Sequence, residues 1–289
     1  MDSLQHDLPV LMLHNLNPEW TSEEWRESEQ DVATLSNALH ALGHPVEIVA
    51  VDDEYLMDRL SVYDPKDYIV FNWCEEIPGV RHSEPSVAAV MESMGFVFTG
   101  SSYNVLSLAH DKPKIKQILD EANIPTPYWK VFTTPDAGLW TFFPAIVKPA
   151  HEHCSIGISS DSIVTCPFEL TNRIEFILET HHQPALVEEF INGREFLNAV
   201  WGNKNISMLP TVEMDYGELT DLRDRVFTYE AKYVAGSRLY ETIDMRVPAE
   251  LNPQEQSELE HVVIATYKAT GCRDYGPGGT AWPDDGSFF

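Results

Sequence analysis

Two apolar segments of the chain end in residues that could act on a phosphorylated ligand. The run from Phe143 ends in Lys148, and a proline follows it. A lysine at the end of a buried strand needs an anionic partner, because an unpaired buried charge is costly. The next ten residues include Ser155 and Gly157, so a flexible loop with a hydroxyl and free backbone N–H groups could fold over phosphates. The alternative is a lysine that reaches solvent beside an ordinary hairpin.

The second apolar segment, Ala185–Val187, leads into carboxylates with a spacing that suits a nucleoside. Glu188 and Glu189 follow it directly, then Phe190 and Ile191, and Glu195 comes seven residues after Glu188. Backbone groups just after Glu188 could bind an adenine edge, and Glu195 could accept the ribose hydroxyls, as acidic residues do in other nucleotide-binding folds. The alternative is a pair of hairpin strands whose acidic side chains face water.

Two further lysines have surroundings that could hold phosphate. Lys232 lies between Tyr229 and Tyr233, and Lys112 follows Asp111 at the start of a predicted helix. Each is also compatible with an ordinary surface lysine, and this alternative is favoured for Lys232 taken by itself, because lysine is seldom buried.

The elements that must position these residues fall into two patterns. In the first part, strands at 9–13, 46–51, 68–73 and 96–98 alternate with helices that begin near Ser22 and Ser83 and stop at Gly43 and Gly95. This alternation predicts an α/β fold with a doubly wound parallel sheet over residues 1–105.

The second part of the chain shows a different pattern, in which neighbouring strands are expected to pair directly in antiparallel sheets. A short helix begins at Asp111, and strands are predicted at 144–148, 156–159, 185–191 and 194–201. Asn192-Gly193 is typical of a two-residue hairpin between the last two strands. A late helix begins at Pro253 and ends before Gly271. We therefore predict a central domain at 106–190 and a carboxy-terminal α+β domain at 191–289.

The order of these clusters resembles the ATP-grasp superfamily, and D-alanine–D-alanine ligases in particular. The resemblance rests on Thr99-Gly-Ser, Asp111-Lys112, Ile124-Pro-Thr-Pro, Pro144-Ala-Ile-Val-Lys148-Pro, Val187-Glu-Glu-Phe-Ile, Gly193-Arg-Glu195-Phe and Tyr229-Glu-Ala-Lys232-Tyr. It implies an ATP- and Mg²⁺-dependent carboxylate–amine ligase that acts through an acyl phosphate on amino acids or other small carboxylates and amines. It also implies a homodimer.

The resemblance assigns roles to individual residues. Lys112, Lys148 and Lys232 would contact the phosphates of ATP, and Ser155 and Gly157 would belong to the lid over them. The segment Glu188, Glu189, Phe190, Ile191 would bind adenine, Glu195 would hold the ribose, and Tyr233 would lie beside the substrate. Lys148, Lys232, Tyr233 and Ser155 form the expected catalytic set.

Two segments depart from the family pattern. Leu13-His14-Asn15 stands where the family has Gly-Gly-x-Ser-x-Glu, which puts D-alanine as the substrate in doubt. After Gly276, the sequence Pro-Gly-Gly-Thr-Ala-Trp-Pro replaces the family's Arg-x-Asp, and no Glu-x-Asn follows before Phe289. No metal ligand is therefore assigned, with Asp284 and Asp285 as poor stand-ins. A truncation, a local frame slip and a true loss all remain open; a true loss favours a nucleotide-binding protein without ligase activity.

Composition limits the other functions. The 289 residues are 43% hydrophobic, and the formal net charge of −27 disfavours nucleic acid and anionic membranes as partners. Four well-separated cysteines without a CxxC pair, and no leader or long apolar run, fit a reduced cytoplasm. A dinucleotide-dependent dehydrogenase is disfavoured because no GxGxxG follows the first strand.

Overall fold

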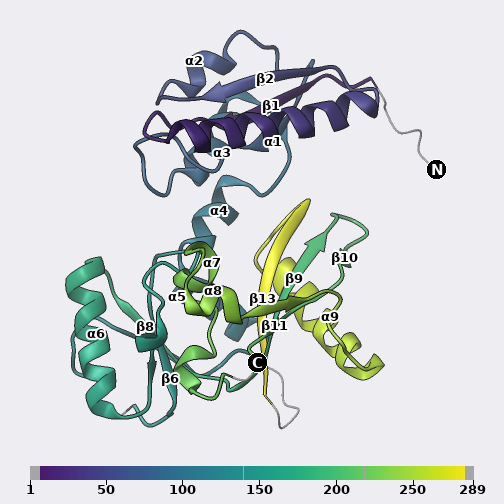
Figure 1. Ribbon diagram of the computed structural model, residues 1–289. Helices are drawn as coiled ribbons and strands as arrows, with labels where there is room; N and C mark the ends of the chain where they lie inside the picture. Colours follow the sequence, from purple (N-terminus) through teal and green to yellow (C-terminus); the bar gives the residue numbers. More distant parts are fainter. Residues whose placement is uncertain (1–6, 139, 218, 284–289) are drawn as a thin grey trace. The chain divides into compact units, whose positions relative to one another are not determined.

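The computed structural model describes residues 7–138, 140–217 and 219–283, and the chain divides into two compact units. Residues 1–107 form the first unit and residues 108–289 the second, and the short helix α4 (Tyr103–Ala109) contains the boundary. Figure 1 labels the elements of both units. The predicted domain boundaries at residues 105 and 190 stay predictions.

The first unit is built on a four-stranded parallel sheet with the order β2-β1-β3-β4. Its strands and helices are β1 (Val10–Asn15), α1 (Ser22–Ala41), β2 (Val46–Val51), α2 (Leu56–Leu60), β3 (Ile69–Trp73), α3 (Glu84–Met94) and β4 (Val97–Phe98). The chain moves to β2 on one side of β1 and then returns to β3 on the other side. Because such crossovers are right-handed, this reversal puts the connecting helices on opposite faces, as a doubly wound fold requires.

Local signals explain where these elements begin and end. Thr21 caps α1 with a reciprocal pair of hydrogen bonds to Glu24, and Gly95 ends α3 in the left-handed region at φ 81°. The core of the unit includes Leu11, Leu13, Val51, Val70 and Met91, each with 0% exposure. The predicted parallel α/β arrangement is therefore confirmed.

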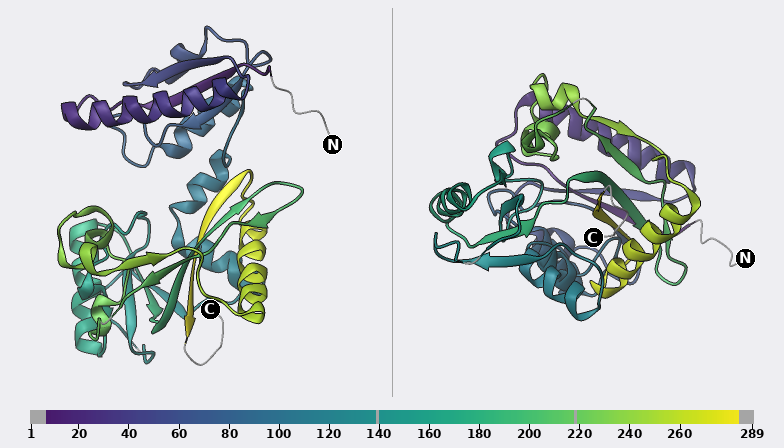
Figure 2. Two further views of the ribbon diagram at one scale, coloured as in Figure 1. Left: turned by 45° about the vertical axis from the view of Figure 1, so that its right-hand side comes forward. Right: turned by 90° about the horizontal axis from the view of Figure 1, so that it is seen from below.

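The second unit contains two antiparallel sheets. The first has the order β5-β8-β6-β7. Its elements, in chain order after α5 (Lys112–Glu121), are β5 (Trp129–Phe132), β6 (Ala145–Pro149), the 3-10 turn η1 (Ser160–Ser162), β7 (Ile163–Val164), α6 (Pro167–His181) and β8 (Ala185–Glu189). Helix α6 packs on this sheet, and Figure 2 shows it as a separate layer. Leu170, Ile174 and Ile177 form the buried face of α6.

The other sheet has the order β10-β9-β11-β12, and β13 pairs with the free side of β9. Its elements are β9 (Gly193–Trp201), β10 (Ser207–Met208), β11 (Val212–Asp215), η2 (Leu222–Asp224), α7 (Tyr229–Tyr233), α8 (Arg238–Thr242), β12 (Asp244–Arg246), α9 (Pro253–Ala269) and β13 (Tyr275–Pro283). Helix α9 covers this sheet through Leu259 and Val263, which pack against Phe196.

Two predictions about the second unit are wrong. Strands β8 and β9 do not form a hairpin, since they belong to different sheets and Asn192-Gly193 is part of the connection between them. Residues 156–159 are not a strand, because the chain there makes turns before η1, and the partner of β6 is β7. Both errors come from local patterns that do not specify the pairing partner.

Candidate functional site

The lysine predicted at the end of an apolar strand is paired with a buried carboxylate. Lys148 lies near the end of β6, and Glu188 lies on the adjacent strand β8, opposite Ile146. The Lys148 Nζ lies 2.5 Å from the Glu188 Oε2, and Glu188 is only 4% exposed. The anionic partner that the sequence required is thus a side chain of the protein itself.

A second lysine, which the sequence interpretation did not select, contacts the other oxygen of the same carboxylate. Lys116 of α5 forms an ion pair with the Glu188 Oε1 and donates a hydrogen bond to Thr126. Burial alone would raise the pKa of Glu188, but the charges of Lys148 and Lys116 outweigh it and lower that pKa to about 2. Glu188 is therefore ionised at neutral pH and holds both ammonium groups in place.

Lys112 lies four residues before Lys116, on the same face of α5, and braces the end of β6. Its Nζ donates to the carbonyl of Pro149 at 3.1 Å and to that of Glu152. Burial, and then the nearby charge of Lys148, lower the pKa of Lys112 to about 8. An ammonium held next to another cation is stabilised by any anion that binds beside it.

The loop with Ser155 follows β6 and is tied to the segment before α7. Cys154 and Ser155 both have left-handed backbones, at φ 51° and 59°. The Ser155 Oγ donates to the Phe227 carbonyl at 2.9 Å, and the Tyr229 N–H donates to the Ile158 carbonyl at 3.3 Å. The loop is thus fastened at two points to the segment that precedes Lys232.

Gly157 has no substitute in this loop, for two reasons. Its φ is 74°, and a Cβ built there would lie 2.6 Å from the Pro149 Cγ and 2.8 Å from the His181 Nε2. Both the backbone conformation and the close approach of neighbouring side chains therefore require glycine.

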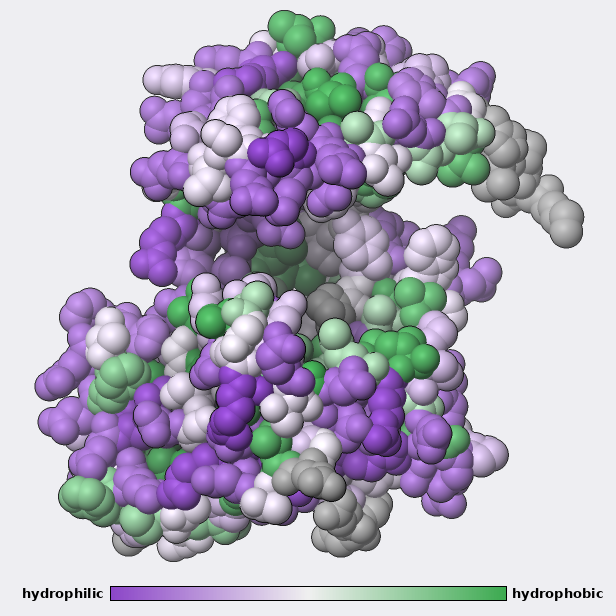
Figure 3. Space-filling view, in the orientation of Figure 1, coloured by the Kyte–Doolittle hydropathy of each residue, from purple (hydrophilic) through white to green (hydrophobic). Residues whose placement is uncertain are grey.

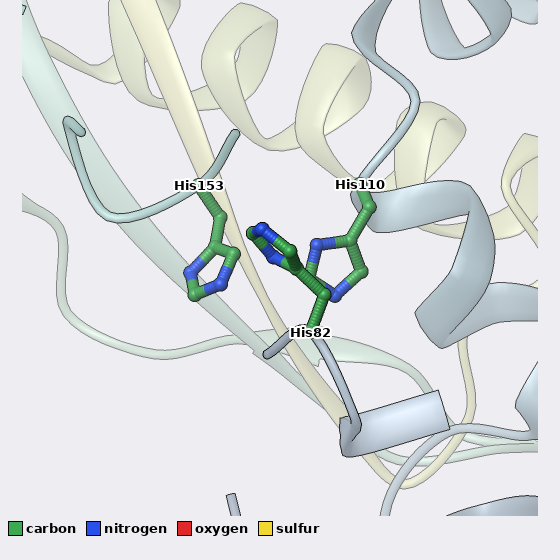
Figure 4. Close-up of side chains that lie close together, drawn as sticks. All are labelled: His82, His110 and His153. Atoms are coloured by element: carbon green, nitrogen blue, oxygen red, sulfur yellow. The ribbon is translucent and has the colours of Figure 1, made fainter. Parts of the chain in front are cut away.

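His110 and His153 connect the start of α5 to this loop. Their rings meet edge to face, with centroids 4.8 Å apart, and the Nδ1 of His153 lies 3.0 Å from the Cys154 Sγ. Figure 4 labels both residues; His82, also drawn there, belongs to the first unit. The aromatic contact adds a second link between α5 and the loop, beside that of Lys112.

Glu195, on β9 of the other sheet, and Lys232, on α7, complete the charged cluster. Burial raises the pKa of Glu195, while a hydrogen bond from the Tyr216 hydroxyl and the charges of Lys148 and Lys232 act against this rise. Burial lowers the pKa of Lys232, whose Nζ lies 4.9 Å from the centre of the Phe227 ring. Since Lys148 and Lys232 both act on Glu195, the two lysines lie in one electrostatic site.

Arg225 is another residue that the sequence interpretation missed. Its charge lowers the pKa of Tyr216, which burial raises, and its Nε is buried without a hydrogen-bond partner among the described residues. The charges that act on this site are those of four lysines (112, 116, 148 and 232), Arg225 and four carboxylates, of Asp120, Glu152, Glu188 and Glu195. The formal excess of one positive charge (5 − 4), in a chain of net charge −27, suits a polyanion.

The backbone after Glu188 leaves the N–H of Ile191 without an acceptor among the described residues. The N–H groups of Glu189 and Phe190 donate to the carbonyls of Tyr128 and Pro144, both at 2.9 Å. No described residue accepts a hydrogen bond from the Ile191 N–H. The carboxylate of Glu188, for its part, is occupied by Lys148 and Lys116. Of this segment, Ile191 is therefore the residue whose N–H can meet a ligand.

Strand β13 stands where the resemblance would place metal ligands. Its register sets Ala281 opposite Glu195, and none of its residues, Tyr275–Pro283, carries a carboxylate. Asp284 and Asp285 lie outside the described residues. Apart from Glu195 on β9, the paired residues of β9 and β13 offer no carboxylate, the ligand through which Mg²⁺ is usually held. The described donor set does not fit a bound Mg²⁺.

The fold and the site define an ATP-grasp protein. Residues 118–279 match the family described as "D-ala D-ala ligase C-terminus", and the chain belongs to this family. It is 32% identical over 249 residues to the uncharacterized protein y4sG of Sinorhizobium fredii, a match that covers 82% of this chain and 69% of that protein.

The chain is also similar to characterised ligases and to a solved crystal structure. The chain is 34% identical over 207 residues to a D-alanine–D-alanine ligase of Carboxydothermus hydrogenoformans, which covers 68% of this chain but only 62% of the ligase. The crystal structure of D-alanine–D-alanine ligase from Bacillus anthracis matches 96% of this chain and 83% of its own, with a TM-score of 0.69 at 20% identity. The fold class predicted from the sequence is thereby confirmed. No helix of the described residues has the length and apolarity to cross a bilayer.

Proposed function

We propose that the chain binds ATP at the cluster of Lys112, Lys148 and Lys232 and uses it to join a carboxylate to an amine. The observation that supports this most strongly is the convergence of cations from α5, β6 and α7 on Glu188 and Glu195. Lysines fixed in advance by buried carboxylates can meet phosphate charge without a large reorganisation. ATP would supply the phosphoryl group that turns a carboxylate into an electrophile.

Three features of the described residues support a nucleotide in this position. The Ile191 N–H would meet the base, Glu195 on β9, which accepts a hydrogen bond from Tyr216, would hold the ribose, and the Ser155 loop, tied to Phe227, would close over the phosphates. Lys148 and Lys232 would stabilise the transferring phosphoryl group, and Ser155 with Gly157 would exclude water. Tyr233, which is 54% exposed, would lie beside the substrate. The substrates we propose are amino acids or other small carboxylates and amines, acted on by a homodimer.

A second candidate function, nucleotide binding without ligation, is favoured by β13 alone. Since the described part of that strand lacks a carboxylate, no step of the reaction is assigned to Mg²⁺ here. The two candidates share the nucleotide site and differ in turnover.

The experiment measures both quantities on the same protein. ATP affinity is determined by calorimetry with and without Mg²⁺, and ADP release is measured with a panel of amino acids as carboxylate and amine. We expect Lys148→Met to abolish both, and Lys130→Met to leave both unchanged, because Lys130 is exposed on β5 and outside the cluster. Tight binding without ADP release selects the second candidate. Absence of ATP binding in the unaltered protein contradicts both.

A further inference from the structure

Helix α6 buries its only arginine. Arg173 is 8% exposed and lies on the same side of α6 as Leu170 and Ile174. The helix also has a solvent-exposed side, where Figure 3 shows hydrophilic and apolar residues next to each other. No carboxylate of the described residues forms an ion pair with Arg173, and burial lowers its pKa, with only the charge of Asp161 acting against this decrease. A buried guanidinium without a carboxylate partner is costly, so its position needs a reason.

The guanidinium of Arg173 is bonded to the loop that follows β6. Its Nη2 donates to the Gly157 carbonyl at 2.7 Å and to the Ser162 Oγ at 2.9 Å. Its Cζ lies 4.5 Å from the centre of the Phe176 ring, a contact that restricts how the planar group can turn. The Nε is buried and has no partner among the described residues, so the bond to Gly157 is kept although one donor of the same group goes unused.

The bond from Arg173 completes an uneven use of the backbone in this loop. The carbonyls of residues 153, 155 and 157 all accept hydrogen bonds within the protein. By contrast, no described residue accepts a hydrogen bond from the N–H of Cys154, Ser155 or Gly157. A turn whose carbonyls are engaged while neighbouring N–H groups remain free is suited to receive an anion.

Arg173 fixes the peptide group between Gly157 and Ile158. The carbonyl of that peptide accepts from Arg173, and its N–H donates to the Ser155 carbonyl at 3.0 Å. Because a peptide group is planar, these two bonds together set its orientation. Gly157 has a φ of 74°, and a glycine can rotate more freely than any other residue. Without the guanidinium, this carbonyl could turn its oxygen toward a bound anion and repel it.

From these contacts we infer that Arg173 is a positioning residue, which keeps the free N–H groups of the loop directed at a bound anion. It acts through the Gly157 carbonyl and does not touch the anion itself. The identity of the anion, the phosphates of ATP, rests on the proposed function. The role of Arg173 is separate from that of the lysines, because none of its hydrogen bonds goes to the carboxylates that hold them.

The test uses the full chain and two probes, inorganic triphosphate and adenosine, with both affinities measured by calorimetry. Triphosphate is the part of ATP that the loop would meet, and adenosine is the part that it would not. We expect Arg173→Met to weaken triphosphate binding about tenfold, the loss typical of one charge-assisted hydrogen bond, and to leave adenosine binding unchanged. Arg173→Lys keeps the charge but not the fork of donors, so it should weaken triphosphate binding about threefold.

Hydrogen exchange of the loop gives a second measurement, which does not depend on a ligand. The Ile158 N–H should exchange about tenfold faster in Arg173→Met, because its peptide group is no longer held at both ends. Arg223→Met is the matched control. The guanidinium of Arg223 also contacts α6, at 2.8 Å from the Glu169 Oε1, but it bonds to no residue of the loop. Its triphosphate affinity and its loop exchange should equal those of the unaltered protein.

Three results would overturn the inference. The unaltered protein fails to bind triphosphate; or Arg173→Met weakens triphosphate and adenosine binding equally, as a general loss of structure would; or Arg223→Met has the same effects as Arg173→Met. Should Arg173→Met not fold, as judged by circular dichroism, Arg173→Lys decides, and an unchanged triphosphate affinity there overturns the inference. Failure of the proposed function is seen separately. Triphosphate binding that depends on Arg173, without ATP binding or ADP release, removes the proposed function and leaves the positioning role intact.

Discussion

Replacing Glu188 with glutamine tests whether one carboxylate holds the cluster of lysines. Glutamine keeps the shape of the side chain and removes its charge, so the ammonium groups of Lys148 and Lys116 would face each other without compensation. Lys116 is the more buried of the two, with 12% side-chain exposure against 24%. We expect the second unit to lose stability and the nucleotide site to lose its geometry together.

The magnitude follows from the pKa of Glu188. Its decrease from 4.5 to about 2, with about 1.4 kcal/mol for each pKa unit, corresponds to about 3 kcal/mol of stabilisation of the ionised form. Removal of one partner from a buried ion pair typically costs about 3–5 kcal/mol, which agrees. Since the folded-state pKa is the lower one, this stabilisation is complete above pH 4.5 and disappears as the pH falls toward 2.

The assay is urea unfolding of the unaltered protein and of Glu188→Gln, at pH 7 and at steps from pH 5 to pH 2.5, monitored by tryptophan fluorescence and circular dichroism. Glu189→Gln serves as control, because the neighbouring carboxylate forms no ion pair in the described structure. We expect a difference of about 3 kcal/mol at pH 7 that shrinks below pH 4.5. Equal stability at pH 7, or a difference that does not change with acid, would refute the reasoning.

Three other results are expected. The pKa of Lys112 is about 8, so only about one tenth of this side chain is protonated at pH 9. The dissociation constant for ATP should therefore rise about tenfold from pH 7 to pH 9 in the unaltered protein, and should not change in Lys112→Arg. A dissociation constant that is independent of pH in both proteins contradicts this. Gly157→Ala should lower the free energy of unfolding by about 1–3 kcal/mol, measured by denaturation. Gly138 also has a positive φ, but no atom would lie within 4 Å of a Cβ there, so Gly138→Ala should lower it less. Equal losses of stability would exclude a steric clash at Gly157 as the cause. Ser155→Ala removes the hydrogen bond to the Phe227 carbonyl, so its free energy of unfolding should fall by about 1 kcal/mol. Limited proteolysis should also cleave the loop faster. An unchanged cleavage rate would show that this hydrogen bond does not hold the loop.

The sequence was sufficient for the parallel sheet and for most strands, because alternation of apolar strands and capped helices is a local property. It was insufficient for the connection after β8. Asn192-Gly193 has the composition of a tight hairpin, but Gly193 is glycine for a different reason: a Cβ there would lie 2.0 Å from the Trp282 carbonyl of β13. That approach joins residues almost ninety positions apart, and no short segment encodes it.

The residues of the candidate site were also only partly predictable from the sequence. Lys148 and Glu188 could be selected from their own strands, although that they pair with each other depends on the register of β6 and β8. Lys116 was within reach, since it lies one helical turn after Lys112 on α5. Tyr216 and Arg225 were not, because only the pairing of β9 with β11 and the turn at η2 bring them near Glu195.

The three residues 190–192 are all that separates the last strand of one sheet from the first strand of the other. The Ile191 N–H, which we propose for the base, belongs to the same short stretch of chain that connects the two sheets. Any ligand gripped by Ile191 would therefore report on, and bias, the angle between the sheets, and by reciprocity that angle would set how long the ligand stays.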